Sequence, residues 1–454
     1  MKHDTKYDDI ILSKNYSKPF NPNHNNNSLV IASSGRGKTT SIVEAQLLHS
    51  FHNSIVFTFS KRKRMTGYVK LLSSRGYNIE YIDFGNSKRS TTGFDPIKYI
   101  NSDKDIKTLA HYIFDVVKTN SSTNDRYWDD SSEDLLCAEI GLCFDLYKMN
   151  QDGYFSEELE NLGVNQIMKK PTFNDVFTVH NNLSFQEIRG TGFTKSTLDN
   201  VFKEVEHWYL EKGECSQSVK WFSSIQGVAA KTVSCIFSNL NTTLDKVFTP
   251  ASLEVINYSF LGQKKSIEFT DIGKQKTAFL IYSSPIDRSN DYFINILYTT
   301  LFKELLYCAE KQPDEILPVP VYIICDDFAV GCRLPDFPKT ISIIRGFGIG
   351  ICLLLQSYAQ LIDMYGESGK QIIIDNCESL LYMGGMDIKT CEDISLKTNM
   401  PLEDILYMNP EKIWIISKQF NKPILDDRYP TYLDPIYLKI FNNDQTNDDL
   451  DEKI

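Results

Sequence analysis

A short loop near the start of the chain has the residue types of a phosphate-binding loop. The pattern Ala32-x4-Gly37-Lys38-Thr39 departs from the usual motif only at its first residue, which is normally glycine. Lys38 is expected to reach the β- and γ-phosphates of a nucleotide, and the hydroxyl of Thr39 to bind Mg²⁺. We therefore predict a site for ATP and Mg²⁺. Its nucleotide-binding residues would be Ser34, Gly35, Arg36, Gly37, Lys38, Thr39 and Thr40.

The sequence on either side of this loop supplies the elements that such a site needs. Residues 28–31 are an apolar, strand-like run, and apolar residues at helical spacing follow from 42 to 48. A strand, a loop of small residues and a helix direct backbone N–H groups and the positive end of the helix dipole at a phosphate. The alternative is a turn that precedes a helix by chance, and the matching strand and helix weigh against it.

Two carboxylates follow a second apolar run. Residues 321–325 (Val-Tyr-Ile-Ile-Cys) are typical of a buried strand, and Asp326 and Asp327 come directly after it. We predict that Asp326 supports the metal ion and that Asp327 orients or deprotonates the attacking water. Related motor ATPases commonly have Glu at the second position, which is longer by one methylene. A solvated acidic turn is the alternative for this pair.

The chain divides into segments of different character. Residues 1–27 are polar and predict a lead-in loop. Strand-like and helix-like segments alternate in residues 28–118 and 255–440, which is typical of a parallel sheet covered by helices. Helical periodicity dominates residues 119–254, and the polar, acidic residues 441–454 predict a disordered tail. The fold class is therefore α/β with an inserted all-α domain. The predicted strands are 28–31, 54–59, 79–83, 266–270, 277–282, 321–325, 349–355 and 379–383.

The composition limits the kind of protein. The chain has 454 residues, 42% of them hydrophobic, so it can bury a large core. Its formal net charge of −11 argues against a protein that coats nucleic acid through bulk positive charge, although it allows a local basic channel. No apolar run approaches the ~20 residues of a membrane-spanning helix, and the ten cysteines form no Cys-x-x-Cys pair. We therefore expect a cytoplasmic protein with reduced thiols.

Several further sequence blocks between residue 28 and about residue 430 occur in the same order as in one known family. Examples are the stretch from Asp326 to Phe337, which contains Pro-Asp-Phe, and the stretch from Arg345 to Ser357, which begins Arg-Gly-Phe-Gly-Ile-Gly. The other blocks are residues 93–100, 127–129, 375–377, 384–387 and 422–429. Together they resemble the type IV coupling proteins of the TraG/TraD kind, which are ring-forming ATPases of bacterial conjugation and type IV secretion.

The resemblance implies a RecA-like nucleotide-binding core and a hexameric ring around DNA. It also implies that a relaxase bound to DNA, or effector proteins, are brought to a secretion channel. In such rings Gln356 would sense the γ-phosphate, and Arg345 or Arg333 could reach a neighbouring subunit's nucleotide. An arginine at a strand start is more often a surface residue in an ion pair, and this remains the alternative for both.

The departures from the family concern the membrane and the rate of hydrolysis. Its usual transmembrane helices are not seen, so the expected location is the cytoplasm or the inner face of the cell membrane. Ala32, Phe59 and Asp327 differ from the family residues at or near the nucleotide and predict slow hydrolysis. Two other hypotheses are a non-hydrolysing nucleotide-binding adaptor for a relaxase or effector, and a DNA pump of the FtsK/HerA kind. The basic run Lys61–Arg64 could face DNA or anionic lipid, or be a solvated loop.

Overall fold

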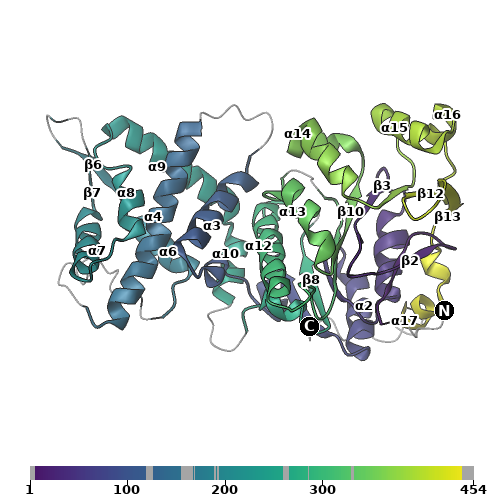
Figure 1. Cartoon of the computed structure of the whole chain (residues 1–454), viewed down its shortest axis with the longest axis horizontal. Coiled ribbons are helices and arrows are strands. Elements are labelled where there is room, and N and C mark those ends of the chain that lie inside the picture. Colours follow the sequence, from purple (N-terminus) through teal and green to yellow (C-terminus); the bar gives the residue numbers. More distant parts are fainter. Residues whose placement is uncertain are drawn as a thin grey trace. The chain divides into compact units, whose positions relative to one another are not determined.

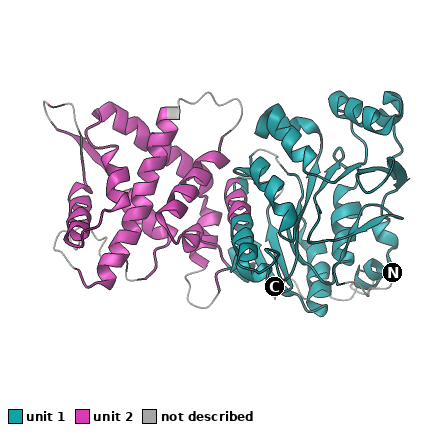
Figure 2. Cartoon of the chain, in the orientation of Figure 1, with its two compact units in different colours: residues 1–92, 267–291, 301–454 teal, residues 93–266, 292–300 magenta. Residues whose placement is uncertain are grey.

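The computed structural model describes residues 6–118, 126–154, 167, 169–188, 191, 194–258, 265–284, 286–328 and 332–441. They form two compact units, shown in teal and magenta in Figure 2. The first unit comprises residues 1–92, 267–291 and 301–454, and the second comprises residues 93–266 and 292–300.

The first unit is built on a nine-stranded sheet with the order β13-β12-β11-β3-β10-β9-β4-β8-β5. The strands from β11 to β5 are parallel to their neighbours, whereas β12 and β13 are antiparallel at one edge. The strands are β3 (Ser28–Ile31), β4 (Ser54–Phe59), β5 (Asn78–Asp83), β8 (Thr277–Tyr282), β9 (Val321–Cys325), β10 (Ile349–Leu355), β11 (Ser379–Tyr382), β12 (Lys412–Ser417) and β13 (Ile424–Asp427).

Helices cover the sheet, so its central strands can be apolar along their whole length (Figure 1). Every residue of β8, β9 and β10 is buried. The helices of this unit are α1 (Ala45–Leu48), α2 (Arg62–Ser74), α11 (Phe269–Ile272), α13 (Phe337–Ile343), α14 (Tyr358–Asp375), α15 (Ile388–Thr398), α16 (Leu402–Leu406) and α17 (Pro435–Phe441). Helix α12 (Asp291–Glu310) belongs to it at both ends, and residues 292–300 are counted with the second unit.

Seven of the eight predicted strands are confirmed, and the prediction at 266–270 is wrong. Ser266 makes only an isolated bridge with Gly93, and the chain then turns into α11. Phe269 and Ile272 are both buried, which is the spacing of one helical turn and not of a strand.

The segment predicted as a lead-in loop contains a short antiparallel pair, β1 (Asp9–Ile11) and β2 (Ser17–Pro19). Ile10, Leu12 and Phe20 are buried in the core of the first unit. The polar composition concealed this role because few apolar residues are enough to fix the pair.

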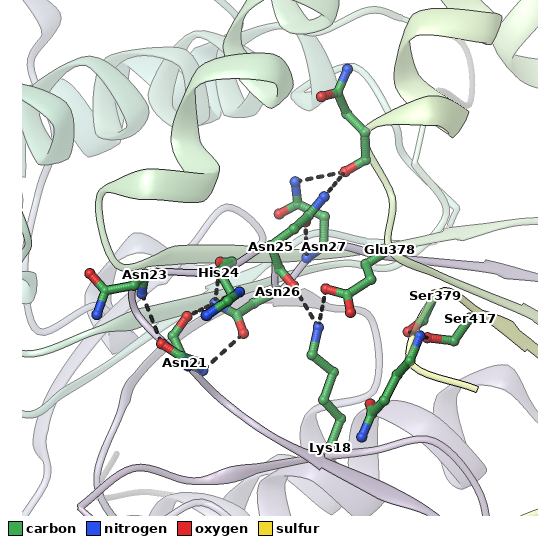
Figure 3. Close-up of polar contacts among 12 residues, drawn as sticks. Lys18, Asn21, Asn23, His24, Asn25, Asn26, Asn27, Glu378, Ser379 and Ser417 are labelled. Atoms are coloured by element: carbon green, nitrogen blue, oxygen red, sulfur yellow. Dashed lines mark hydrogen bonds and ion pairs between the residues drawn. The ribbon is translucent and has the colours of Figure 1, made fainter. Parts of the chain in front are cut away.

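Asparagine side chains close the edge of the sheet at which β3 begins (Figure 3). The side-chain oxygen of Asn27 accepts a hydrogen bond from the Ile351 N–H at 3.2 Å, and its amide donates to the Asn376 carbonyl at 3.1 Å. Nearby, Lys18 Nζ forms an ion pair with Glu378 at 2.5 Å. The start of β3 is therefore bonded to the segments that begin β10 and β11.

Replacing Asn27 with Ala is expected to lower the free energy of unfolding by about 1–3 kcal/mol. The change leaves the buried Ile351 N–H without its partner, and water cannot readily replace it because Asn27 is 1% exposed. The Asn376 carbonyl keeps a hydrogen bond from the Asn25 amide at 2.9 Å. Urea denaturation followed by circular dichroism measures the effect. Asn23→Ala, at an exposed position of the same segment, is the matched control and should cost little. Equal stabilities of the two variants would contradict this assignment.

The second unit is mainly helical and wider than the predicted insertion of residues 119–254. Its first helix, α3 (Asp103–Val116), packs on α4 (Arg126–Gln151), with Lys107 Nζ 2.6 Å from Asp134. The other helices are α6 (Phe173–Asn182), α7 (Asp199–Glu211), α8 (Gln217–Ser223), α9 (Ala230–Val247) and α10 (Pro250–Tyr258). The all-α prediction also missed a two-stranded pair, β6 (Phe185–Glu187) and β7 (Thr194–Ser196).

The carboxyl group of Asp95 predicts a pH dependence of stability. It accepts hydrogen bonds from the N–H groups of Ile97 at 2.9 Å and Phe173 at 3.0 Å. Burial raises the pKa of Asp95 to about 7, and these bonds oppose the rise only in part. Between about pH 4 and pH 7 the folded state therefore holds a proton on Asp95 that the unfolded state has lost. The free energy of unfolding must fall as the pH rises toward 7, and then level off.

We expect the wild type to lose on the order of 1 kcal/mol of stability, relative to Asp95→Asn, between about pH 6 and pH 8. Urea denaturation of both proteins at several pH values measures this difference. Asp103→Asn, at an exposed carboxyl of the same unit, should keep the wild-type pH profile. Parallel profiles of Asp95→Asn and wild type would show that this carboxyl does not titrate in that range.

Among the described residues, no helix has both the length and the hydropathy needed to cross a bilayer. Of the predicted acidic tail, residues 442–454 lie outside the described residues, and Phe441 ends α17.

Candidate nucleotide site

The predicted phosphate loop joins β3 to a short π-helix, Thr39–Glu44, which continues as α1. Gly35 and Gly37 have φ angles of 78° and 81°, in the left-handed region that favours glycine. Ala32, which replaces the usual first glycine, does not have a positive φ, so its Cβ causes no backbone strain. The departure at this position is therefore compatible with a working loop.

The side chain of Lys38 folds back under the phosphate loop. Its Nζ donates a hydrogen bond to the Ala32 carbonyl at 2.6 Å, and the residue is 8% exposed. Burial lowers the pKa of the Lys38 ammonium, while the carboxylates of Asp327 and Asp326 raise it. These carboxylates lie close enough to favour the charged form that a phosphate requires.

Thr39 and Asp326 meet across the site. The Thr39 hydroxyl donates to Asp326 Oδ2 at 2.8 Å, so the loop after β3 touches the residue that directly follows β9. Burial raises the pKa of Asp326, and the hydrogen bond from Thr39 and the charge of Lys38 oppose this rise. A hydroxyl and a partly buried carboxylate side by side are the hard oxygen ligands that Mg²⁺ prefers. The residues present therefore fit this metal.

Parallel topology explains why these residues converge. The phosphate loop, Asp326 and Gln356 follow the carboxyl ends of β3, β9 and β10, and β10 lies between the other two strands. Ligands of open parallel sheets bind at this edge. A cavity of about 450 Å³ opens there, and its lining includes the loop from Ser34 to Thr40, Asp326, Asp327 and Gln356. All of the predicted nucleotide- and metal-binding residues thus lie together.

Arg345 does not belong to this cavity. It lies in a 3₁₀ turn, Ile344–Gly346, that precedes β10, whereas Gln356 follows the same strand. The two residues therefore lie at opposite ends of β10, Arg345 before its first residue and Gln356 after its last. The role of Arg345 toward a neighbouring subunit stays a prediction. The other candidate, Arg333, places its guanidinium 5.3 Å from the ring of Tyr365.

Two arginines of the basic run Lys61–Arg64 bind carboxylates of the fold, which the sequence did not indicate. Arg62 binds Asp83 through two hydrogen bonds of 2.9 and 2.6 Å. Arg64 donates to Glu44 at 2.7 Å and lines the cavity. Both arginines are thereby taken up by buried carboxylates, which disfavours a surface for DNA or anionic lipid at these two positions.

The cavity has one apolar side that accounts for another departure. Phe59, at the end of β4, lines the cavity, and its ring stacks on Tyr81 with a centroid distance of 6.0 Å. It also meets Tyr282 edge-on at 5.6 Å. The departure from the family at Phe59 therefore places an aromatic cluster on this side of the cavity.

A segment near the other end of the chain completes the site, and sequence reasoning missed it. Arg428 Nη1 donates to the Arg36 carbonyl at 3.1 Å, and the Thr431 hydroxyl donates to the Thr40 carbonyl at 2.5 Å. A Cβ at Gly37 would lie 2.6 Å from Arg428 Nη1, so this contact is a second reason for glycine there. Tyr432 lines the cavity. Only the resemblance of residues 422–429 to a family block pointed to this region.

Comparisons with known proteins agree with this architecture. A family model described as Type IV secretory system Conjugative DNA transfer matches residues 8–399. The bacterial conjugative coupling protein TrwBdeltaN70, in its trigonal form with sulphate, has a TM-score of 0.58 and 14% identity, covering 89% of this chain and 86% of that chain. The plasmid coupling protein TrwB with the ATP analogue ADPNP gives 0.58 and 14%, with coverages of 89% and 85%.

TrwB in complex with ADP and Mg²⁺ is also similar, with a TM-score of 0.53, 13% identity, and coverages of 92% and 89%. No curated protein matches this chain significantly. At these identities the structural likeness concerns the fold alone. The predicted RecA-like P-loop fold is confirmed.

Proposed function

The chain belongs to the family of conjugative DNA transfer proteins of type IV secretory systems, and from this premise we propose that it is an ATPase. Its substrates would be DNA–protein complexes, such as a relaxase on DNA, or effector proteins, which it recruits or moves toward a secretion channel. The contact between Thr39 and Asp326 carries this proposal, because it joins a phosphate loop to a metal-supporting carboxylate.

Each side chain of the cavity has a role in this proposal. The N–H groups of the loop and the Lys38 ammonium bind the β- and γ-phosphates. Thr39 and Asp326 hold Mg²⁺, which would neutralise phosphate charge when bound. Asp327 orients the attacking water, and Gln356 contacts the γ-phosphate. The complexes of TrwB with ADPNP and with ADP and Mg²⁺ support the choice of nucleotide and metal.

Ring formation and DNA are part of the same proposal and rest on family membership. We expect a hexamer around DNA, with Arg345 of one subunit acting on the nucleotide of the next. With a net charge of −11, binding to DNA must come from local basic surface. We place the protein in the cytoplasm, recruited to the membrane by the secretion channel.

Steady-state ATP hydrolysis, with and without single- and double-stranded DNA, tests the proposal. A rate that DNA raises, together with a hexameric mass in the presence of ATP and DNA, supports the motor. A monomer that turns over no ATP under any of these conditions, and binds none, refutes it.

A non-hydrolysing adaptor for a relaxase or effector is the second candidate, and Asp327 favours it. This carboxylate stands where related motors have Glu, and its backbone has a φ of 51°. Tight binding of ATP without turnover, with and without DNA, would select the adaptor over the motor.

A further inference from the structure

Tyr432 forms a wall of the cavity that the phosphate loop opens into. Tyr432 is 48% exposed although Arg64 lies over its ring, with the guanidinium 5.5 Å from the centroid, so part of the ring remains accessible to a ligand. The residue lies beyond the part of the chain that the family model matches, residues 8–399.

Neighbouring side chains fix the orientation of this ring. Arg64 Nη2 donates a hydrogen bond to the Tyr432 hydroxyl at 2.9 Å, and Tyr437 packs against the ring edge-on with a centroid distance of 5.2 Å. Arg64 is itself held by Glu44, which also accepts a hydrogen bond from Tyr68 at 3.1 Å. A ring held in this way loses little further freedom when a ligand packs on it.

The position of Tyr432 along the cavity is set by its predecessor. The hydroxyl of Thr431 donates to the carbonyl of Thr40, within the first turn after the phosphate loop. Tyr432 is therefore held beside Thr40, where the loop ends, while it lines the same cavity. A nucleotide held by its phosphates at Lys38 extends its sugar and base away from the loop, toward the cavity walls.

We propose that Tyr432 is the platform on which the base of the bound nucleotide stacks, so that Arg428, Thr431 and Tyr432 form part of the nucleotide site. This assignment rests on the proposed ATP binding and adds the residue that recognises the base. Recognition is through the flat face of the base. The polar groups beside it, Arg64 and Glu44, are already bonded to each other and leave fewer donors and acceptors for the edge of the base.

The chemistry of the wall suits a base better than a further phosphate. A cation that binds an anion there would need free hydrogen-bond donors. Two of the nitrogens of Arg64 already donate to Glu44 and Tyr432. An aromatic face, by contrast, stabilises any stacked base.

The test compares two ligands on the full chain, Mg-ATP and Mg-tripolyphosphate, by equilibrium binding. Tripolyphosphate keeps the phosphates but has neither sugar nor base. Tyr432→Ala is expected to weaken ATP roughly tenfold or more and to leave tripolyphosphate unchanged. Tyr432→Phe, which keeps the aromatic face, should retain most of the ATP affinity. Leu433→Ala is the matched control, since Leu433 is 74% exposed and does not line the cavity.

Three results would overturn the assignment. The first is wild-type affinity of Tyr432→Ala for ATP. The second is an equal loss of both ligands, which would mean that the segment only supports the phosphate loop. Tyr432→Leu keeps a bulky side chain without the aromatic face, so wild-type ATP affinity in this variant is the third. A wild-type chain that binds neither ligand would instead refute the proposed function itself.

Discussion

Replacing Lys38 with Ala is expected to abolish measurable ATP turnover, with a loss on the order of 10²–10³-fold or more in kcat. The ammonium lies beneath the loop, bonded to the Ala32 carbonyl and close to two carboxylates. No other described lysine lines this part of the cavity except Lys61, which follows β4. Removal of the Lys38 ammonium takes away the cation that lies beneath the loop and would bind the β- and γ-phosphates. Steady-state hydrolysis and ATP binding, measured side by side, test this expectation.

The matched control for this change is Lys422→Ala. Lys422 is an exposed lysine of the same unit that does not line the cavity, and its replacement should leave turnover at the wild-type level. Hydrolysis by purified Lys38→Ala at the wild-type rate would mean that catalysis takes place elsewhere. The thermal stabilities of both variants should be compared first, so that loss of the fold is not mistaken for loss of chemistry.

Lengthening Asp327 to Glu is expected to raise the rate of hydrolysis, by up to about 100-fold. The oxygens of Asp lie roughly 1.3–1.5 Å further back than those of Glu, and such a displacement is enough to slow a reaction that depends on an oriented water. The free energy of unfolding should fall by no more than about 1–2 kcal/mol, because Asp adopts the left-handed φ of 51° more readily than Glu does. We expect kcat to rise with little change in KM, as measured by steady-state kinetics.

Asp326→Glu is the informative counterpart. Asp326 already touches Thr39 at 2.8 Å, so an extra methylene there would push the carboxylate into the loop and should lower turnover. Opposite effects at adjacent residues would separate their roles. An unchanged rate in Asp327→Glu would show that the length of this side chain does not limit hydrolysis.

The phosphate loop, the acidic pair and most of the sheet could be predicted from the sequence because each has a local signal. Loop residues 32–40 are contiguous, and buried parallel strands are visible as apolar runs. Parallel strands bring their carboxyl ends to one edge, so the meeting of Lys38 with Asp326 followed without knowledge of the full strand order.

The remaining parts of the site depend on contacts between distant residues. Arg428 and Arg36 are 392 positions apart, and no pattern in either segment announces their contact. The run Lys61–Arg64 looks like an exposed basic loop, and the ion pairs of Arg62 and Arg64 depend on Asp83 and Glu44, which lie on separate elements. Residues 266–270 alternate like a strand, but Ser266 makes only an isolated bridge with Gly93 and the chain then turns into α11.

The asparagine cluster at the start of β3 has a mechanical consequence. The strand has four residues, so about 13 Å of chain separates the Asn27 bonds from the phosphate loop. Because β3 is bonded so close to the loop, the loop has little freedom to move relative to the sheet. If the proposed motor turns over ATP, we expect its movement in the chain after β9 and β10 and not in the phosphate loop.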